Sequence, residues 1–402
     1  MRILAIETSC DDTAVAILEV ESYKVIKFKV LSNIVSSQKI HQNYGGVFPM
    51  MAKREHQANL TPALMQALKQ AKLLNPKSET LNPKQIPNAK LKILNTVLEK
   101  EEDLLKQLLT FLAKYEKPFD HAQGKPAIDA IAVTHGPGLE PCLWVGVNFA
   151  RALSAFWNIP IIPVNHIEGH ILVNFLPKVN ENPKSEILNP KLTFPAISLV
   201  VSGGHTQLIL VKGIGKYKII GETRDDAAGE CFDKAAKILG LGYPGGPIIA
   251  EIVSKANNPP RPIKLPRPMM HSGDYDFSFS GLKTAILYAV KGKTLNEQTV
   301  EEMCVEIQQA IIDVLLHKTI KAAKDFKAKT IILGGGVSAN QELRKQLAQK
   351  IKKEIPNTQY LIPDTALSTD NALMIAITAF FHKNKKASWK TLKAKANLRV
   401  GN

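Results

Sequence analysis

The chain has 402 residues, 45% of them hydrophobic, and carries 52 Lys and Arg against 36 Asp and Glu, a formal net charge of +16. This composition excludes a disordered chain, and no run approaches the ~20 consecutive apolar residues that a membrane-spanning helix needs. The positive charge favours a polyanionic partner, nucleic acid first, over a lysine-rich surface that serves only solubility.

The length and the cysteines indicate the class of protein. A chain of this size has room for two ordinary domains with buried cores. The sequence opens on MRILAIETS, without the segments of a secretory signal, and its cysteines lack the spacing of a metal-binding motif. We therefore expect a cytoplasmic protein with reduced thiols and no association with membranes.

The predicted elements indicate a duplicated α/β architecture. RILAIE (2–7) is typical of a buried strand, and the polar turn TSCDDT and a second strand, AVAILEV, follow it. The pattern returns as AISLVV (196–201), the turn SGGHT and QLILVKG. TIILGGGVSAN (330–340) adds a buried strand that runs into glycines before the helix QELRKQLAQKIKKE.

Two segments have the composition of insertions. Residues 72–106 contain LNPK twice, and residues 178–193 contain ENPKSEILNPK. Asn-Pro steps favour turns and the composition offers little to bury, so we interpret both as surface insertions. VLEKEEDLLKQLLTFLAKY (97–115) predicts an amphipathic helix that rejoins the fold.

Several glycine-rich turns lie next to apolar strands or open a helix, where backbone N–H groups can point at an anion. They are THGPGLEPCLWVG (134–146), VSGGHTQ (201–207), YPGGP (243–247) and LGGGVSAN (333–340). None matches the P-loop pattern G-x-x-x-x-G-K-[ST], and none has G-x-G-x-x-G in the context of a dinucleotide fold. We therefore expect a phosphate-bearing ligand, such as a nucleotide, in a cleft between two lobes.

Acidic residues cluster around these turns. Asp11 and Asp12 occupy the first turn, and Asp226, Glu230 and Asp233 are spaced so that three carboxylates share one helix face. The small residues after Asp226 and the YPGGP turn downstream suggest that backbone approaches a ligand closely. We therefore favour a functional site over a solvated helix face.

The stretch NHIEGH places His166 and His170 four residues apart, so one helix face can offer two imidazoles to a metal ion. The zinc-protease patterns H-E-x-x-H and H-x-x-E-H need a glutamate where this chain has Ile167 or Gly169. Glu168 fits neither pattern, so a metalloprotease is disfavoured.

A third metal ligand has to come from elsewhere in the chain. LSTDNALMIAITAFFH (367–382) predicts a helix with Ser368 or Thr369 near its cap and Asp370 in its first turn. Two histidines and one carboxylate would leave coordination positions open for a substrate, as a catalytic metal requires.

The positive charge is concentrated at the C-terminus. There is no acid from Asn371 to Asn402. A concentrated basic tail suits a phosphate backbone, and a frayed, solvated tail is the alternative. The basic residues are Lys383, Lys385, Lys386, Lys390, Lys393, Lys395 and Arg399.

Several stretches, which together cover nearly the whole chain apart from the LNPK segments, resemble one family. They are IETSCDDT, YGGVFP, HGPG, NHIEGH, VSGGHTQL, DDAAGECFDKAAKILGLGYPGGP, FSFSGLKT, GGGVSAN and STDNALM. This ordered set is similar to the TsaD family, the tRNA N6-adenosine threonylcarbamoyltransferases. The resemblance implies an α/β fold of two lobes, actin-like and sugar-kinase-like (ASKHA), with duplicated domains and a central cleft.

The resemblance also implies site residues and a reaction. His166, His170 and Asp370 would hold an iron ion (Fe²⁺), with zinc as the alternative, and Asp11 and Asp12 are the catalytic candidates. The threonylcarbamoyl group would pass from threonylcarbamoyl-AMP to N6 of adenosine 37 in tRNAs that read ANN codons, and AMP would leave. The implied substrate-binding positions are Val200, Val201, Ser202, Gly203, Gly204, Asp233, Gly246 and Asn340.

The expected organisation is an N-terminal lobe of residues 1–165 and a C-terminal lobe of residues 166–402, with the last helix and the basic tail packed back on the first lobe. The family's degenerate paralogue TsaB and its small ATPase TsaE are the expected partners beside tRNA. The chain departs from the family where Asp12 and Met50 each replace a glutamate and Lys53 replaces a serine.

Three alternatives stay open at this point. The first is a kinase or ATPase of the same fold, whose phosphoryl transfer would not need the set of two histidines and an aspartate. The second is the metalloprotease, which the position of Glu168 disfavours. The third is a non-catalytic scaffold like the paralogue, which the intact metal motifs disfavour.

Overall fold

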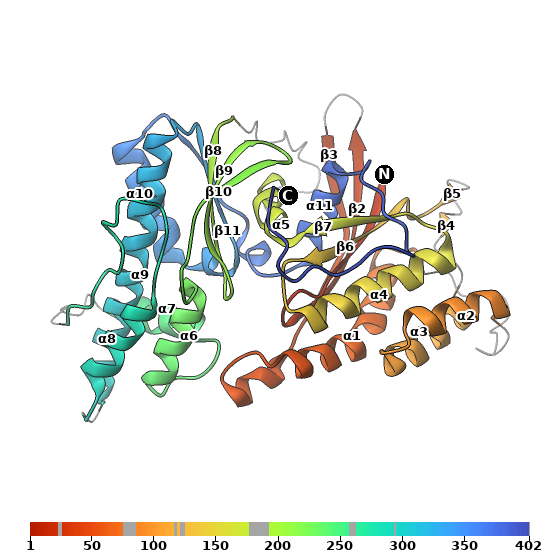
Figure 1. Cartoon of the computed structure of the whole chain (residues 1–402), viewed down its shortest axis with the longest axis horizontal. Helices are drawn as coiled ribbons and strands as arrows, with labels where there is room; N and C mark the ends of the chain where they lie inside the picture. The colour runs from red at the N-terminus through yellow and green to blue at the C-terminus, as the bar shows by residue number, and fades with distance from the viewer. Residues whose placement is uncertain are drawn as a thin grey trace.

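The chain folds around two five-stranded sheets, which Figure 1 shows on either side of helices α5 (His166–Leu172) and α11 (Ala372–Phe381). The computed structural model describes residues 1–22, 26–74, 86–115, 119–120, 125–176, 193–256, 263–292 and 295–401. No helix among these residues is both long enough and apolar enough to cross a membrane.

The first sheet has the strand order β3-β2-β1-β6-β7. Its first three strands are antiparallel, whereas β1, β6 and β7 run parallel to one another. The apolar runs of β1 and β2 are buried on both faces because helices cover each side of the sheet. The strands are β1 (Arg2–Glu7), β2 (Asp12–Ser22), β3 (Ile26–Ser37), β6 (Ala130–Gly136) and β7 (Ile161–Asn165).

The second sheet repeats this topology. Its order is β10-β9-β8-β11-β12, so the first strand again lies between its antiparallel second and its parallel fourth. Two sheets with the same order and the same directions confirm the predicted α/β fold of two duplicated lobes. The strands are β8 (Ala196–Val201), β9 (Thr206–Gly213), β10 (Lys216–Glu222), β11 (Thr330–Gly334) and β12 (Gln359–Leu361).

Alternating side chains divide the packing of each sheet between two faces. On one face of the first sheet, Leu4 and Ile6 pack with the helices drawn below that sheet in Figure 1. On one face of the second sheet, Leu199 packs with the helices drawn to the left of that sheet and below it. The first set is α1 (Pro49–Gln70), α2 (Asn88–Val97), α3 (Glu102–Lys114) and α4 (Glu140–Trp157). The second set is α6 (Ala228–Ile238), α7 (Gly245–Lys255), α8 (Ser280–Val290), α9 (Glu297–Asp325) and α10 (Gln341–Glu354).

The two remaining sheet faces share one core. Ile3 of the first sheet and Val200 and Ile332 of the second belong to the same buried cluster, together with residues of α5 and α11. The lobes therefore meet through α5 and α11, and this central layer positions the candidate site. Shorter elements are β4 (Phe119–Asp120), β5 (Lys125–Pro126) and the 3-10 helices η1 (Lys39–Tyr44), η3 (Val173–Phe175), η4 (Gly336–Ala339) and η5 (Thr365–Leu367).

The interpretation of residues 72–106 as a surface insertion is wrong for their C-terminal part. Leu94, Leu98 and Leu104 are each no more than 1% exposed and belong to the core of the first lobe. The leucine spacing gives α2 an apolar face that the Asn-Pro composition upstream obscured, whereas α3 is the amphipathic helix predicted over 97–115, with its start at Glu102. Residues 75–85 and 177–192, which include most of the LNPK segments and of the second predicted insertion, lie outside the described residues.

We expect Leu104→Ala to lower the free energy of unfolding by about 2–5 kcal/mol, because it removes a fully buried side chain and leaves a cavity. Urea denaturation followed by tryptophan fluorescence measures this change. Lys106→Ala, an exposed position on the same helix, is the control and should change stability by no more than about 0.5 kcal/mol. Equal effects of the two substitutions would contradict the packing of α3 into the core.

Candidate metal centre

Helix α5 carries both histidines of the predicted metal set. Asn165 caps the helix, because its side chain accepts hydrogen bonds from the backbone amides of Ile167 (2.9 Å) and Glu168 (3.1 Å). The helix begins at His166 and contains His170 one turn later, so both imidazoles lie on one face, with ring centroids 4.7 Å apart.

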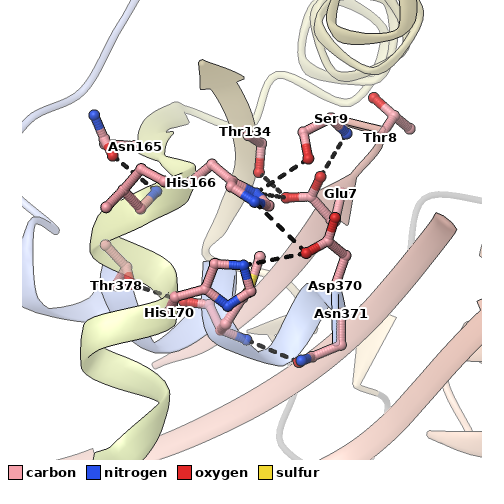
Figure 2. Close-up of polar contacts among 12 residues, drawn as sticks. Glu7, Thr8, Ser9, Thr134, Asn165, His166, His170, Asp370, Asn371 and Thr378 are labelled. Carbon is pink, nitrogen blue, oxygen red and sulfur yellow. Dashed lines mark hydrogen bonds and ion pairs between the residues drawn. The ribbon is translucent and has the colours of Figure 1, made fainter. Parts of the chain in front are cut away.

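Asp370 reaches the histidines from the loop before α11. The helix begins at Ala372 and its cap is Asn371, whose side chain accepts a hydrogen bond from Met374 N (3.1 Å). The expected cap at Ser368 or Thr369 is therefore wrong, and Asp370 lies just before the helix rather than in its first turn. In this position its carboxylate points toward both imidazoles (Figure 2).

The three side chains have the arrangement of a metal-binding set. Asp370 Oδ1 lies 3.5 Å from His166 Nε2 and 3.2 Å from His170 Nε2, and one ligand atom from each residue lies within 4.8 Å of the others. His170 is fully buried, yet neither of its ring nitrogens makes a hydrogen bond of good geometry. A buried imidazole that lacks a hydrogen bond of good geometry, beside a second imidazole and a carboxylate, is typical of a metal-binding residue.

A second layer of polar groups holds His166. Ser9 Oγ lies 3.1 Å and Glu7 Oε2 lies 3.3 Å from His166 Nδ1, the nitrogen that faces away from Asp370 (Figure 2). The fully buried carboxylate of Glu7 also accepts hydrogen bonds from the backbone amide of Ser9 (2.5 Å) and from the hydroxyl of Thr134. Such a partner fixes the ring and its tautomer, so that Nε2 is left for a metal.

The charges of the site are strongly coupled. Burial opposes the charged form of His166, but the carboxylates of Asp370 and Glu7 raise its pKa to about 9. Burial lowers the pKa of His170. Burial also opposes the charge of Asp370, yet the imidazoles of His166 and His170 hold its pKa well below its usual range. A metal cation that binds here would therefore displace a proton from His166.

Glu168 does not face the metal set. Its carboxylate lies 2.7 Å from His382 Nε2, beyond the end of α11. A zinc protease needs this carboxylate beside the metal as a general base, so the pairing argues further against a protease.

The predicted catalytic candidates lie in and after the β1–β2 turn. Burial, and then the charge of Asp370, raise the pKa of Asp11 and bring that of Asp12 to about 7. The turn is held by the buried His56 of α1, whose ring contacts Cys10 O (2.9 Å) and Thr13 Oγ1 (2.8 Å). Both carboxyl groups are therefore electrostatically coupled to the metal set.

The predicted substrate positions Val200 to Gly204 lie at the carboxyl end of β8. The side chains of Val200 and Val201 are fully buried in the core, so only their backbone is available to a ligand. Gly203 and Gly204 are exposed, and open space surrounds the position of a Cβ atom at each. The neighbouring strand β11 runs parallel to β8, so its glycine turn reaches the same edge of the sheet.

The other predicted substrate residues already make internal contacts. Asp233 Oδ1 accepts a hydrogen bond from Gly245 N (2.7 Å), which fixes the turn that contains Gly246, and burial raises the pKa of Asp233 to about 6. Asn340 caps α10 by accepting from Leu343 N (2.9 Å). These side chains therefore shape glycine turns, whatever further contact they make with a ligand.

His205 is a neighbour of the site that the sequence motifs do not assign. It closes the turn after β8, where Ser202 N donates to His205 O (2.8 Å). Burial, and then the charges of His166 and His170, lower its pKa to about 4. The sequence motifs contain His205, Glu7 and Thr134. A local pattern does not show, however, which of a motif's side chains lies near the set of His166, His170 and Asp370.

Comparison with known proteins identifies the family. The model of the TsaD family, described as tRNA N6-adenosine threonylcarbamoyltransferase, matches residues 29–77 and 115–377. The chain belongs to the TsaD family. Two curated relatives with the same description come from Thermosipho melanesiensis, 42% identical over 94% of each chain, and Thermosipho africanus, 40% identical over 100% of each chain. A third, from Porphyromonas gingivalis, is 38% identical over 94% of this chain and 92% of that protein.

Two solved structures resemble the TsaD chain distantly. A HypF from T. kodakarensis is 12% identical, with a TM-score of 0.43 over 70% of this chain and 43% of its own. A ROK hexokinase from Thermus thermophilus is 10% identical, with a TM-score of 0.42 over 96% of this chain and 99% of its own.

Two departures from the TsaD pattern lie on α1. Met50 is 60% exposed. Lys53 Nζ lies 3.8 Å from Glu101 Oε1, a nearly buried carboxylate that also accepts a hydrogen bond from Asn148 Nδ2 (3.3 Å). Lys53 therefore partly neutralises an acid that the α2–α3 connection buries against α4.

We expect His166→Ala, His170→Ala and Asp370→Ala each to lose bound metal while the far-ultraviolet circular dichroism spectrum stays unchanged, because each removes one of three ligands. Metal analysis of protein purified without chelators measures the occupancy. The control is His317→Ala, a histidine on α9 whose ring meets that of His271 edge to face and which should keep full occupancy. Full occupancy in a His166/His170 double variant would rule out this centre.

We expect Glu7→Gln to weaken metal affinity by about 10–100-fold, because the carboxylate that orients His166 becomes a neutral amide. Competition with a chromophoric chelator measures the affinity for Zn²⁺ without any activity assay. Glu168→Gln is the matched control, since Glu168 is also a buried glutamate but pairs with His382. An affinity that falls as much in the control as in Glu7→Gln would contradict a specific role of Glu7.

Proposed function

We propose that this TsaD protein transfers the threonylcarbamoyl group of threonylcarbamoyl-AMP to N6 of adenosine 37 in tRNAs that read ANN codons. The product is N6-threonylcarbamoyladenosine (t6A) and the leaving group is AMP. The acceptor nitrogen bonds to the carbamoyl carbon, the bond from that carbon to the phosphate oxygen breaks, and N6 loses a proton. We place this reaction in the cytoplasm.

The observation that carries the proposal is the set of His166, His170 and Asp370. Three protein ligands leave positions for a substrate, which is typical of a catalytic metal and not of a structural one. Together with membership of a transferase family, this favours metal-assisted transfer over the other activities of the fold. We propose Fe²⁺ as the ion and Zn²⁺ as the alternative, since imidazole and carboxylate suit both.

A metal held here would supply Lewis acidity toward oxygens of the donor. The chain's own groups have separate tasks. The exposed backbone of Gly203 and Gly204, at the carboxyl end of β8, is suited to the phosphate of the donor. Asp12, with a pKa near 7, and Asp11 are the candidates to accept the proton from N6.

The acceptor is a base in a single-stranded loop. In the single-stranded anticodon loop the adenine is not held in a base pair. Its exocyclic amine can therefore reach the candidate metal centre, which a base inside a duplex could not. Because that amine is a weak nucleophile, much of the acceleration has to come from holding donor and acceptor together. The net charge of +16 suits the binding of such an RNA.

We expect wild-type protein, with TsaB and TsaE present, to form t6A on a tRNA that reads an ANN codon and none on the same tRNA with guanosine at position 37. Mass spectrometry of nucleoside digests measures the product, and AMP should appear in equal amount. Asp370→Ala should lose transfer together with its metal. Steady ATP hydrolysis that survives in Asp370→Ala, without t6A, would favour the kinase or ATPase alternative.

We also expect the isolated chain to be poorly active and to need TsaB and TsaE for multiple turnover. The exposed Met50 and the Lys53 departure lie on α1, so we place the effect of these partners on the first lobe. The measurement is t6A formed per enzyme over time, with and without the two proteins. Robust turnover by the chain alone would show that this member works independently.

A further inference from the structure

The basic C-terminal segment is fixed along the protein by its backbone. Ala387 N donates to Ile161 O of β7 (2.8 Å), and Arg151 of α4 donates to Trp389 O (2.6 Å). Leu392 is 6% exposed and belongs to the core of the first lobe. The segment from Lys383 to Arg399 is therefore ordered along the first lobe, and we call it the strap. Figure 1 shows the chain returning from it to a C-terminus between the two sheets.

The strap next reaches the glycine turn after β6. Lys395 N donates to His135 O (2.7 Å), and Gly138 N donates to Ala396 O (3.2 Å). Gly136 allows this approach, because a Cβ atom there would lie 1.9 Å from Lys395 O. Close by on β6, Thr134 donates to Glu7 beside the metal set. The strap thus ends its course on the first lobe next to the candidate metal centre.

The cations of the strap are open to solvent, and two of them, Lys383 and Lys390, also lie over the rings of Phe380 and Trp389. Six lysines are exposed, and among the residues that the structure describes no carboxylate lies within ion-pair distance of any of them. They are Lys383, Lys385, Lys386, Lys390, Lys393 and Lys395. Arg399 differs, since it pairs with Glu222 of β10 at 2.9 Å and so joins the strap to the second lobe.

We propose that these six lysines form the surface that binds the phosphate backbone of tRNA and leads its anticodon loop to the metal centre. The inference deepens the proposed function and rests on it. A stretch of exposed lysines without any acid matches a polyanion, whereas a segment that served only solubility would be expected to mix acidic residues with the lysines. Because the backbone is already ordered, little conformational entropy is lost when the phosphates bind.

The test compares three variants with the wild type in tRNA titrations at several salt concentrations. The first replaces the six strap lysines with glutamine, and the second replaces the same lysines with arginine. The third is the matched control, in which six exposed lysines elsewhere become glutamine. These control positions are Lys69, Lys327, Lys329, Lys345, Lys352 and Lys353.

We expect the strap glutamine variant to raise the Kd for tRNA at least about tenfold at about 0.15 M salt. It should also flatten the plot of log K against log salt by about 0.7–0.9 for each phosphate that the strap no longer binds. The arginine variant should restore both quantities, and the control should leave the slope nearly unchanged. Binding of AMP, measured by calorimetry, should be the same in all four proteins.

If the glutamine variant of the strap keeps the wild-type slope of log K against log salt, the proposal is overturned. It is also overturned if the control variant weakens tRNA binding as much, because the loss would then follow from net charge alone. Failure of the arginine variant to restore binding would also overturn it, because the weaker binding would then reflect a damaged strap. Failure of the proposed function is distinct from these outcomes: wild-type protein would bind tRNA through the strap and form no t6A.

Discussion

The complete burial of helix α5 between the two sheets is the constraint on which the site depends. Every residue from His166 to Leu172 is buried. A Cβ atom at Gly334 would lie 2.5 Å from the backbone oxygen of His170, and one at Gly169 would lie 3.2 Å from Met374 of α11. The backbone that carries the histidines is thus in close contact with β11 of the second sheet and with α11. Folding of the two lobes around α5 therefore fixes the ligand geometry before any metal binds.

Burial on this scale also determines the charges of the site. Glu7 is fully buried and the side chain of Asp370 is only 18% exposed, and two carboxylates around one largely buried site need cationic partners. In the protein alone, the proton on His166 is that partner, which is why its pKa is raised to about 9 against the effect of burial. A divalent cation would take over this task. It would also offset the negative charge of Asp370, which raises the pKa of Asp11 and of Asp12. Metal binding would therefore lower the pKa of both carboxyl groups.

The duplicated α/β architecture and the placing of His166 and His170 on one helix face could be predicted from the sequence, because both leave periodic signals: repeated buried strands, and two histidines one helical turn apart. It did not reveal contacts between distant segments, such as Thr134 with Glu7, 127 residues apart. The cap of α11 was misplaced because Ser368, Thr369 and Asn371 all favour that position. The leucines of α2 were missed because Asn-Pro steps nearby dominate the local composition, whereas the helical spacing of 97–115 did predict α3.

The last part of the chain joins the site to the surface. It contains in turn the candidate ligand Asp370, the inter-sheet helix α11 and the strap. The basic residues of the strap are therefore joined to the candidate metal centre by a single helix. The strap holds the first lobe through backbone hydrogen bonds at Ala387 and Lys395. It reaches the second lobe through the pair of Arg399 and Glu222, whose side chains are 53% and 38% exposed. An ion pair so open to solvent contributes little free energy. Val400, which is 5% exposed in the core that both sheets share, and Gly401, where a Cβ atom would lie 2.6 Å from Tyr217 O of β10, hold this end of the chain to the second lobe more firmly than the ion pair does.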